Sequence, residues 1–233
     1  MLAKEHVIFS ILLSFPLILL LIFKPIYLII FLIGLILGSL IPDIDEENSY
    51  VYKLVNKIQK RIIYLKEKNV KKFEEERKKL TIQLILAYFL YIYALLIKYL
   101  IYKPLAFFTK EQHRGITHTI YFPIIYVAFL FLILYFLKLP FKLAFWFLLG
   151  NFLGVLFHIL GDSLTKSGIA PFYFGIRLKG KYLTGKDSNV PIKIILLFLI
   201  LTILLKLFFE VSWIFYYILV FLYFIYIWVS SGG

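Results

Sequence analysis

The sequence predicts an all-α protein, a polytopic helical bundle that crosses a membrane about six times. Of its 233 residues, 62% are hydrophobic, and the mean hydropathy is +0.91. Soluble domains are about half apolar, so this composition is typical of an integral membrane protein. Six apolar runs are long enough, or nearly so, to cross a bilayer as helices: residues 7–23, 26–41, 119–137, 141–160, 192–209 and 213–229.

Prolines mark the breaks between these runs. Lys24-Pro25 separates the first two runs, and the segment 138–140, Lys-Leu-Pro, separates the next two. Proline cannot donate a hydrogen bond inside a helix, so both segments are predicted to be turns of helical hairpins. Pro42 ends the second run, because the residue before a proline is driven out of the helical region.

The positive charge is distributed unevenly along the chain. Of the 26 lysines and arginines, eleven lie in residues 53–79 and six in residues 166–193. By the positive-inside rule, the loops that hold them are cytoplasmic, in a multi-pass protein of the cell membrane. Such loops explain the charge without nucleic acid, so no specific nucleic-acid partner is expected. The absence of cysteine excludes disulfides and thiolate metal ligands.

Residues 46–80 are predicted to be a basic amphipathic insert in an otherwise single membrane domain, residues 1–233. The first half repeats an apolar residue at helical spacing, at Val51, Val55, Ile58, Ile62 and Leu65. Such a helix suits the anionic inner surface of a membrane. The second half, EKNVKKFEEERKKL, is predicted to be a solvated helix. A soluble arm that binds a partner protein is the alternative.

Residues 82–108 are apolar enough to span a membrane, but they include Lys98 and Lys103. If Asp45 and His113 lie on one side of the membrane, the chain between them crosses an even number of times. A 27-residue helix is about 40 Å long, which is too short for two crossings. The segment is therefore predicted to be re-entrant or to lie in the membrane plane, with both lysines reaching the surface.

Histidines and aspartates gather at two predicted hairpin mouths. His6 begins the first run, and PDID, residues 42–45, closes the second. HRGITHT opens the next hairpin at residue 113, and HILGD closes it at residue 162. If both mouths face the cytoplasm, they bring together one set of polar residues: His6, Asp43, Asp45, His113, His118, His158 and Asp162.

The types and spacing of these side chains favour a divalent metal site. His158 and Asp162 are four residues apart, so they share one helix face and can bind one ion. Imidazole and carboxylate ligands without sulfur suit zinc or manganese, and this number of ligands allows one or two ions. The small-residue patterns GLILG and GNFLG allow the helices that carry them to pack closely. The competing interpretation is that the histidines are interface anchors and the aspartates are ordinary turn residues.

Four segments together resemble the YdjM family of membrane-bound metal-dependent hydrolases, which are LexA-regulated inner-membrane proteins of bacteria. They are His6, GSLIPDID, HRGITHT and HILGDSLTKSGIAPF. The resemblance covers roughly residues 1–46 and 110–175. It implies hydrolysis and the seven metal ligands named above. More distantly, the pattern of His and Asp on bundled helices is similar to zinc-dependent phospholipase C, a likeness at the level of the fold alone.

The sequence therefore favours a metal-dependent hydrolase that acts at the cytoplasmic face on a membrane lipid or another amphiphilic phosphoester. Asp45 or Asp162 is the candidate general base, and Arg114 suits a bidentate grip on phosphate. Ser163 and Thr165 are alternative nucleophiles, but no histidine is dedicated to activating them, so they are expected to support the site through hydrogen bonds. Four cations of the following loop either steer an anionic head group or only set the topology: Lys166, Arg177, Lys179 and Lys181.

Other classes of function would use the same residues. A divalent-cation transporter normally places its acids near the middle of the bilayer, whereas the predicted ligands cluster at one face. A metal sensor, or a scaffold that recruits a partner through residues 46–80 and holds a structural ion, is a further alternative. Substrate, metal identity and oligomeric state are left open by the sequence.

The predicted topology can be tested with reporter fusions. Fusions after Asp45 and at Arg114 are expected to report the same, cytoplasmic compartment, because both positions are predicted to flank one site. A fusion at the basic segment 66–72 serves as the cytoplasmic reference. Opposite locations for Asp45 and Arg114 would contradict both the topology and a shared metal site.

Overall fold

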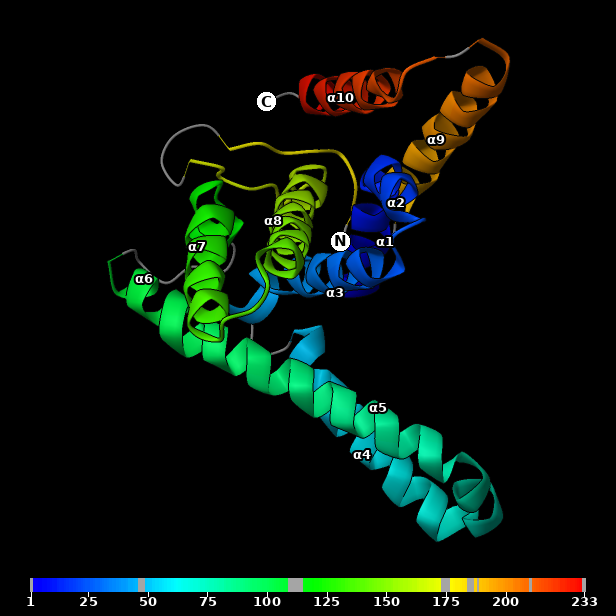
Figure 1. The fold of residues 1–233 in the computed structure, drawn as a ribbon, viewed down its shortest axis with the longest axis vertical. Helices are drawn as coiled ribbons and strands as arrows, with labels where there is room; N and C mark the ends of the chain where they lie inside the picture. Colours follow the sequence, from blue (N-terminus) through cyan, green and yellow to red (C-terminus); the bar gives the residue numbers. More distant parts are fainter. Residues whose placement is uncertain are drawn as a thin grey trace. The chain divides into compact units, whose positions relative to one another are not determined.

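The computed structural model describes residues 2–45, 49–108, 115–172, 177–183, 187, 189–209 and 211–231, without the side chains of Asp45, Phe108 and Phe208. Within these ranges the chain is helical, and the only β-structure is two isolated bridges, so the predicted all-α fold is confirmed (Figure 1). The chain forms two compact units. We call Met1–Pro42 with Arg114–Gly233 the bundle unit, and Asp43–His113 the hairpin unit. A single membrane domain stays a prediction.

Each predicted apolar run contains a helix of the bundle unit. The elements are α1 (Ala3–Leu13), α2 (Phe15–Leu21), α3 (Pro25–Leu40), η3 (Ile116–His118), α7 (Tyr121–Phe136), α8 (Phe141–Ser163), α9 (Val190–Phe209) and α10 (Trp213–Ser230). By length and composition, α8, α9 and α10 can each cross a membrane, and α1 with α2 can form one bent span. Helices α3 and α7 are shorter but equally apolar.

The first predicted run is bent rather than straight. Helices α1 and α2 meet at Ser14 with an angle of 63°. The cause is Pro16, which lacks the N–H that would bond to the carbonyl of Leu12 and whose ring crowds that carbonyl. The hydroxyl of Tyr216 on α10 donates to the Leu12 carbonyl instead, at 2.9 Å. The Leu12 carbonyl freed by the bend is therefore satisfied by α10, and sequence periodicity does not reveal that this helix is its partner.

Helices α3 and α8 form the most extensive helix contact in the described chain. A Cβ atom added to Gly34 or Gly38 would lie 2.3 or 2.2 Å from a carbonyl oxygen of α8. One added to Gly150 or Gly154 would lie 2.3 Å from a carbonyl oxygen of α3. The predicted close packing at both glycine pairs is confirmed. Residues early in α3 contact residues early in α8, and later residues contact later ones, so the two helices run parallel.

The hairpin unit contains α4 (Tyr50–Lys68), α5 (Val70–Ile97), a π-helical turn η2 (Lys98–Tyr102) and α6 (Lys103–Phe108). The predicted amphipathic face is confirmed, since Val51, Val55 and Leu65 are buried. This face packs on α5, the neighbouring antiparallel helix in Figure 1, rather than being left for the membrane surface. Asn69 separates the two helices and caps α5 by accepting a hydrogen bond from the Lys72 N–H.

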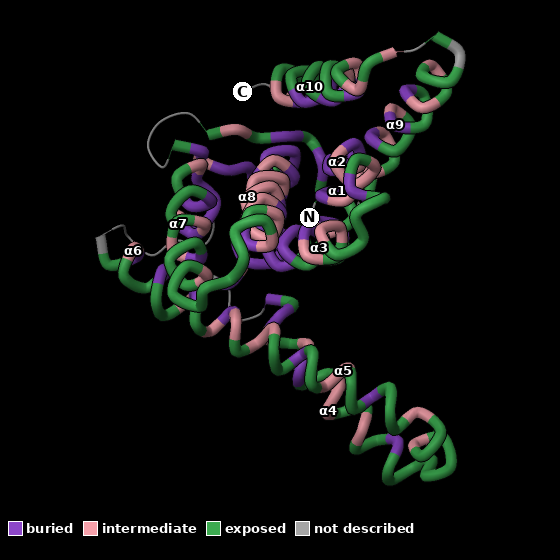
Figure 2. The backbone as a smooth tube through the Cα atoms, viewed as in Figure 1, coloured by how far each residue is buried: buried purple, intermediate pink, exposed green. Residues whose placement is uncertain are grey.

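The described residues 70–107 form one continuous helical segment of 38 residues. The re-entrant alternative for residues 82–108 is therefore wrong, because the segment does not reverse direction. No glycine interrupts it, and the wide turn η2 lies just before Pro104, where one helical N–H is missing. The segment is long and apolar enough to cross a membrane, and its outer surface is exposed (Figure 2). The in-plane alternative stays a prediction.

The close packing at the glycines of α3 and α8 predicts that glycine-to-alanine substitutions there destabilise the protein, which is the opposite of their usual effect in a helix. Alanine normally stabilises a helix relative to glycine by up to about 1 kcal/mol. Gly38→Ala and Gly154→Ala are instead expected to lower the free energy of unfolding by about 1–3 kcal/mol each, because the new methyl group overpacks the interface. Thermal unfolding in detergent measures this effect.

The matched control is Ile33→Ala on α3, where the side chain is 46% exposed. It removes a larger group but leaves the α3–α8 contact intact, so a smaller loss is expected. Alanine at both glycines raising the melting temperature would contradict the close contact.

Candidate metal centre

Four buried polar side chains of the bundle unit converge at one end of α8. His6 comes from the first turns of α1, His118 from η3, and His158 with Asp162 from the last turns of α8. Each is at most 1% exposed. Ionisable side chains in such surroundings are costly and are usually functional. The sequence predicted these residues to gather, and the structure brings all four of them together.

Asp162 is the centre of the group. His6 Nε2 lies 3.3 Å from Oδ1 of Asp162, and His118 Nε2 lies 3.3 Å from Oδ2. His158 Nε2 lies 3.8 Å from Oδ2. The rings of His6 and His158 are stacked, with centroids 3.6 Å apart. Three imidazole Nε2 atoms therefore face one carboxylate.

The α3–α8 contact orients His158. Close packing at Gly154 brings the carbonyl of Ser39 to 2.7 Å from His158 Nδ1. A carbonyl can only accept, so Nδ1–H donates and the proton of a neutral ring is on Nδ1. Nε2 then presents its lone pair toward Asp162, which is the arrangement that a backbone carbonyl imposes on metal-ligating histidines.

A short turn orients His118 in a similar way. The 3₁₀ turn closes with a hydrogen bond from the His118 N–H to the Gly115 carbonyl. The hydroxyl of Thr117 lies 3.0 Å from His118 Nδ1. This contact occupies Nδ1 and leaves Nε2 for the centre of the site.

His6 is held on α1 by burial, by stacking on His158 and by the contact of its Nε2 with Asp162. Its Nδ1 has no hydrogen-bond partner in the part of the chain that the structure describes. A buried ring nitrogen without a partner is unusual in a folded protein and calls for a ligand, a water or an ion.

Asp43 is the fourth member of a group with His118, His158 and Asp162. Each of these residues offers one ligand atom, and these atoms lie within 4.8 Å of one another. Asp43 is joined by a peptide bond to Pro42, the last residue of its segment of the bundle unit. This attachment keeps Asp43 near the end of α3, four residues after the Ser39 carbonyl that contacts His158.

Helix orientation adds to the electrostatics of the site. The parallel helices α3 and α8 both end here, at Leu40 and Ser163. The C-terminal end of a helix carries about half a negative charge. Two such ends and a buried carboxylate favour a cation at this position. With only nitrogen and oxygen donors, the residues fit zinc or manganese.

The other predicted site residues either lie outside the described residues or bond to the backbone. His113, Arg114 and the side chain of Asp45 lie outside the described residues. The hydroxyl of Ser163 donates to the Leu160 carbonyl at 2.6 Å, and that of Thr165 donates to the Asp162 carbonyl at 2.7 Å. Both bonds go to backbone carbonyls, so the supporting role of Ser163 and Thr165 stays a prediction.

The loop after Asp162 folds back on itself. Isolated bridges join Thr165 to Tyr182 and Ile169 to Leu178. Gly180 packs so tightly on the Leu164 carbonyl that a Cβ would lie 2.0 Å from that oxygen. We call the described residues 164–172 and 177–183 the return loop. Its four predicted cations are all exposed beside the end of α8: Lys166, Arg177, Lys179 and Lys181.

Comparison with known proteins identifies the family. The family model described as YdjM inner membrane protein matches residues 1–232, almost the whole chain. The chain belongs to the YdjM family. The comparisons found no match among the curated proteins and none among the solved structures. Membership of the YdjM family places the chain among inner membrane proteins, as its apolar helices indicate.

Sequence reasoning missed the groups that orient the histidines of this YdjM member. Ser39 acts through its backbone carbonyl, which no side-chain pattern reveals. Thr117 stands beside His118 inside HRGITHT, so its proximity was a usable signal. Asn151 was also missed: it accepts a hydrogen bond from the Tyr126 hydroxyl at 2.7 Å and joins α7 to α8.

Thr117→Val is expected to weaken metal binding by about 10–100-fold, because it removes the group that occupies His118 Nδ1. Thr119→Val is the matched control, since the Thr119 hydroxyl donates to the Ile116 carbonyl. Titration of the metal-free protein with zinc or manganese measures both affinities. Equal affinity in the two variants would show that Thr117 does not orient a ligand.

Proposed function

We propose that the chain is a membrane-embedded, metal-dependent hydrolase that acts on a phosphoester or lipid-type substrate at the cytoplasmic face. The observation that supports this most strongly is the convergence of three imidazole Nε2 atoms on Asp162, at the end of a membrane helix. A site built only for stability would more simply be apolar, because buried ionic groups seldom add stability over well-packed hydrophobic residues.

His6, His118, His158, Asp162 and Asp43 would hold the metal, as zinc or manganese, with one or two ions. A divalent ion there would supply Lewis acidity toward a phosphoryl oxygen and would activate water. The number of oxygen and nitrogen donors supports such an ion, and so does His6 Nε2, which faces Asp162 Oδ1 at 3.3 Å.

The proposed proton acceptor is Asp45. Both oxygens of Asp162 face imidazole nitrogens, which favours Asp162 as a ligand rather than as the base. Asp45 ends the turn that begins at Pro42 and is two residues beyond Asp43. A carboxylate there would take a proton from the attacking water.

Positive groups near the site would bind the substrate phosphate. Arg114, four residues before His118, would grip phosphate oxygens in a bidentate manner. The exposed cations of the return loop would attract an anionic head group. Their charge also supports a cytoplasmic location for this end of the bundle.

A divalent-cation transporter is the second candidate, and a metal sensor or scaffold is the third. Transporters typically bind their ions near the bilayer midplane. Here His158 and Asp162 lie in the last six residues of α8, which favours an enzyme working at the membrane surface.

His158→Ala is expected to lose bound metal and to reduce hydrolysis by at least about 100-fold, the scale of a missing catalytic element. The assay compares phospholipids and a soluble phosphodiester, before and after chelation and metal replacement. Ser163→Ala is the control, because its hydroxyl is already donated to the Leu160 carbonyl, and it should retain activity.

Hydrolysis that survives both chelation and His158→Ala would reject the metal-dependent mechanism. Loss of activity in Ser163→Ala with metal retained would instead indicate a serine nucleophile. Metal-dependent ion flux into liposomes without hydrolysis would favour the transporter.

A further inference from the structure

At the end of the bundle unit opposite the candidate metal centre lies an amphipathic groove. A groove of about 680 Å³ separates the start of α3 from the start of α8. It lies roughly 30 Å along α8 from Asp162, at 1.5 Å per residue. Its lining comes from two short segments: Lys24, Pro25, Ile26, Tyr27, Pro140, Phe141, Lys142 and Leu143.

The walls of the groove are apolar and its rim is cationic. Ile26 is 65% exposed and Phe141 is 74% exposed, so both present apolar surface to an occupant. Lys24 and Lys142 are also exposed, one from each wall. This combination suits an amphiphile with an apolar tail and a negative head.

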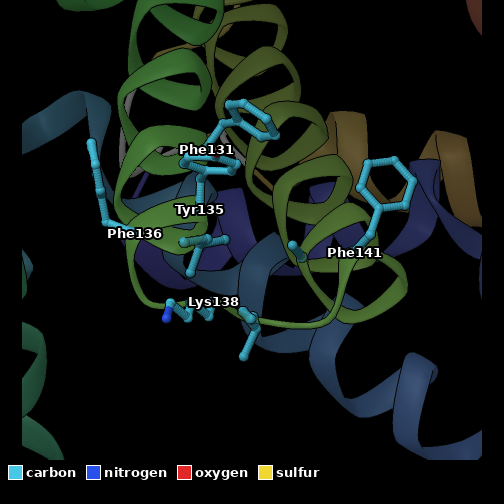
Figure 3. A pocket seen from close by; sticks show the side chains of 8 residues that line it. Phe131, Tyr135, Phe136, Lys138 and Phe141 are labelled. Atoms are coloured by element: carbon cyan, nitrogen blue, oxygen red, sulfur yellow. The ribbon is translucent and has the colours of Figure 1, made fainter.

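A neighbouring groove of about 590 Å³ extends the same surface. It shares Phe141 and is lined by α7 residues as well as by Lys138 (Figure 3). In Figure 3 the rings of Phe131, Tyr135 and Phe141 lie around it. A long apolar chain could therefore continue from the first groove along the α7–α8 turn.

In the described segments that line the two grooves, the positive charge has no acidic partner. Segments 17–42 and 119–161 contain Lys24, Lys138 and Lys142 but no aspartate or glutamate. The parallel helices α3 and α8 also begin here, and helix N-termini add further positive potential. These lysines stand on the side that the positive-inside rule leaves poor in charge, so topology does not account for them.

We propose that this groove binds one anionic phospholipid, with an acyl chain on Ile26 and Phe141 and the phosphate between Lys24 and Lys142. Basic pockets between membrane helices bind anionic lipid head groups in this manner. Charge complementarity selects the anionic class, and the volume is within the range of small-molecule sites. The site is independent of the metal centre and of the proposed hydrolysis.

The test measures lipid binding to the purified chain by native mass spectrometry. Phosphatidylglycerol and phosphatidylcholine with the same acyl chains are compared. Wild-type protein is expected to retain phosphatidylglycerol preferentially. Lys24→Gln/Lys142→Gln should weaken that binding by about 30-fold, since each lysine near a membrane surface contributes roughly a factor of five.

Two further variants sharpen the test. Lys206→Gln is the control, because Lys206 is exposed, lies over the Trp213 ring at 5.8 Å and does not line the groove. It should bind phosphatidylglycerol as the wild type does. Ile26→Trp should also weaken binding, because the larger side chain fills the space for the acyl chain.

Equal retention of phosphatidylglycerol by the wild type and the double glutamine variant would overturn the proposal. Equal retention of phosphatidylcholine and phosphatidylglycerol by the wild type would do the same. Binding of soluble glycerol phosphate without lipid would show an anion site only, and a dimer that excludes lipid from the groove would show a second copy as its occupant. Either outcome also overturns it.

Discussion

The close contact between α3 and α8 is the constraint on which the bundle unit depends. Four glycines bring the two backbones together without side chains between them. As a consequence the Ser39 carbonyl reaches His158 and fixes the direction of its ring. If the helices moved apart by the width of a methyl group, this hydrogen bond would be lost. Packing and chemistry are therefore coupled through one interface.

Parallel packing also gives the unit two chemically different ends. Both helices end at the buried His and Asp residues, and both begin at the grooves with exposed lysines. Helix dipoles then add negative potential at the end that holds candidate metal ligands, and positive potential at the other end. The same pair of helices favours a cation at one membrane surface and an anion at the other.

Much of this arrangement was predictable because it follows from local sequence patterns. Apolar runs gave the helices, and the spacing of His158 and Asp162 gave a shared face. The bend at Ser14 was not predicted, because Pro16 lies inside an apolar run and its freed carbonyl is satisfied by Tyr216 from a distant helix. The re-entrant alternative for residues 82–108 was wrong because no glycine or proline interrupts the chain before Pro104, so residues 70–107 form one continuous helical segment. Backbone partners such as Ser39 depend on tertiary contacts and leave no mark in the sequence.

The most direct test of the central claim is X-ray absorption at the edge of the metal that the purified protein binds. The expected spectrum is that of a site of nitrogen and oxygen ligands without sulfur, with three imidazoles in the wild type and two in His6→Ala. Ser10→Ala, one turn further along the same helix, should leave the spectrum unchanged. No bound metal under replete conditions, or a spectrum without imidazole ligands, would contradict it and would return the histidines to the role of buried structural residues.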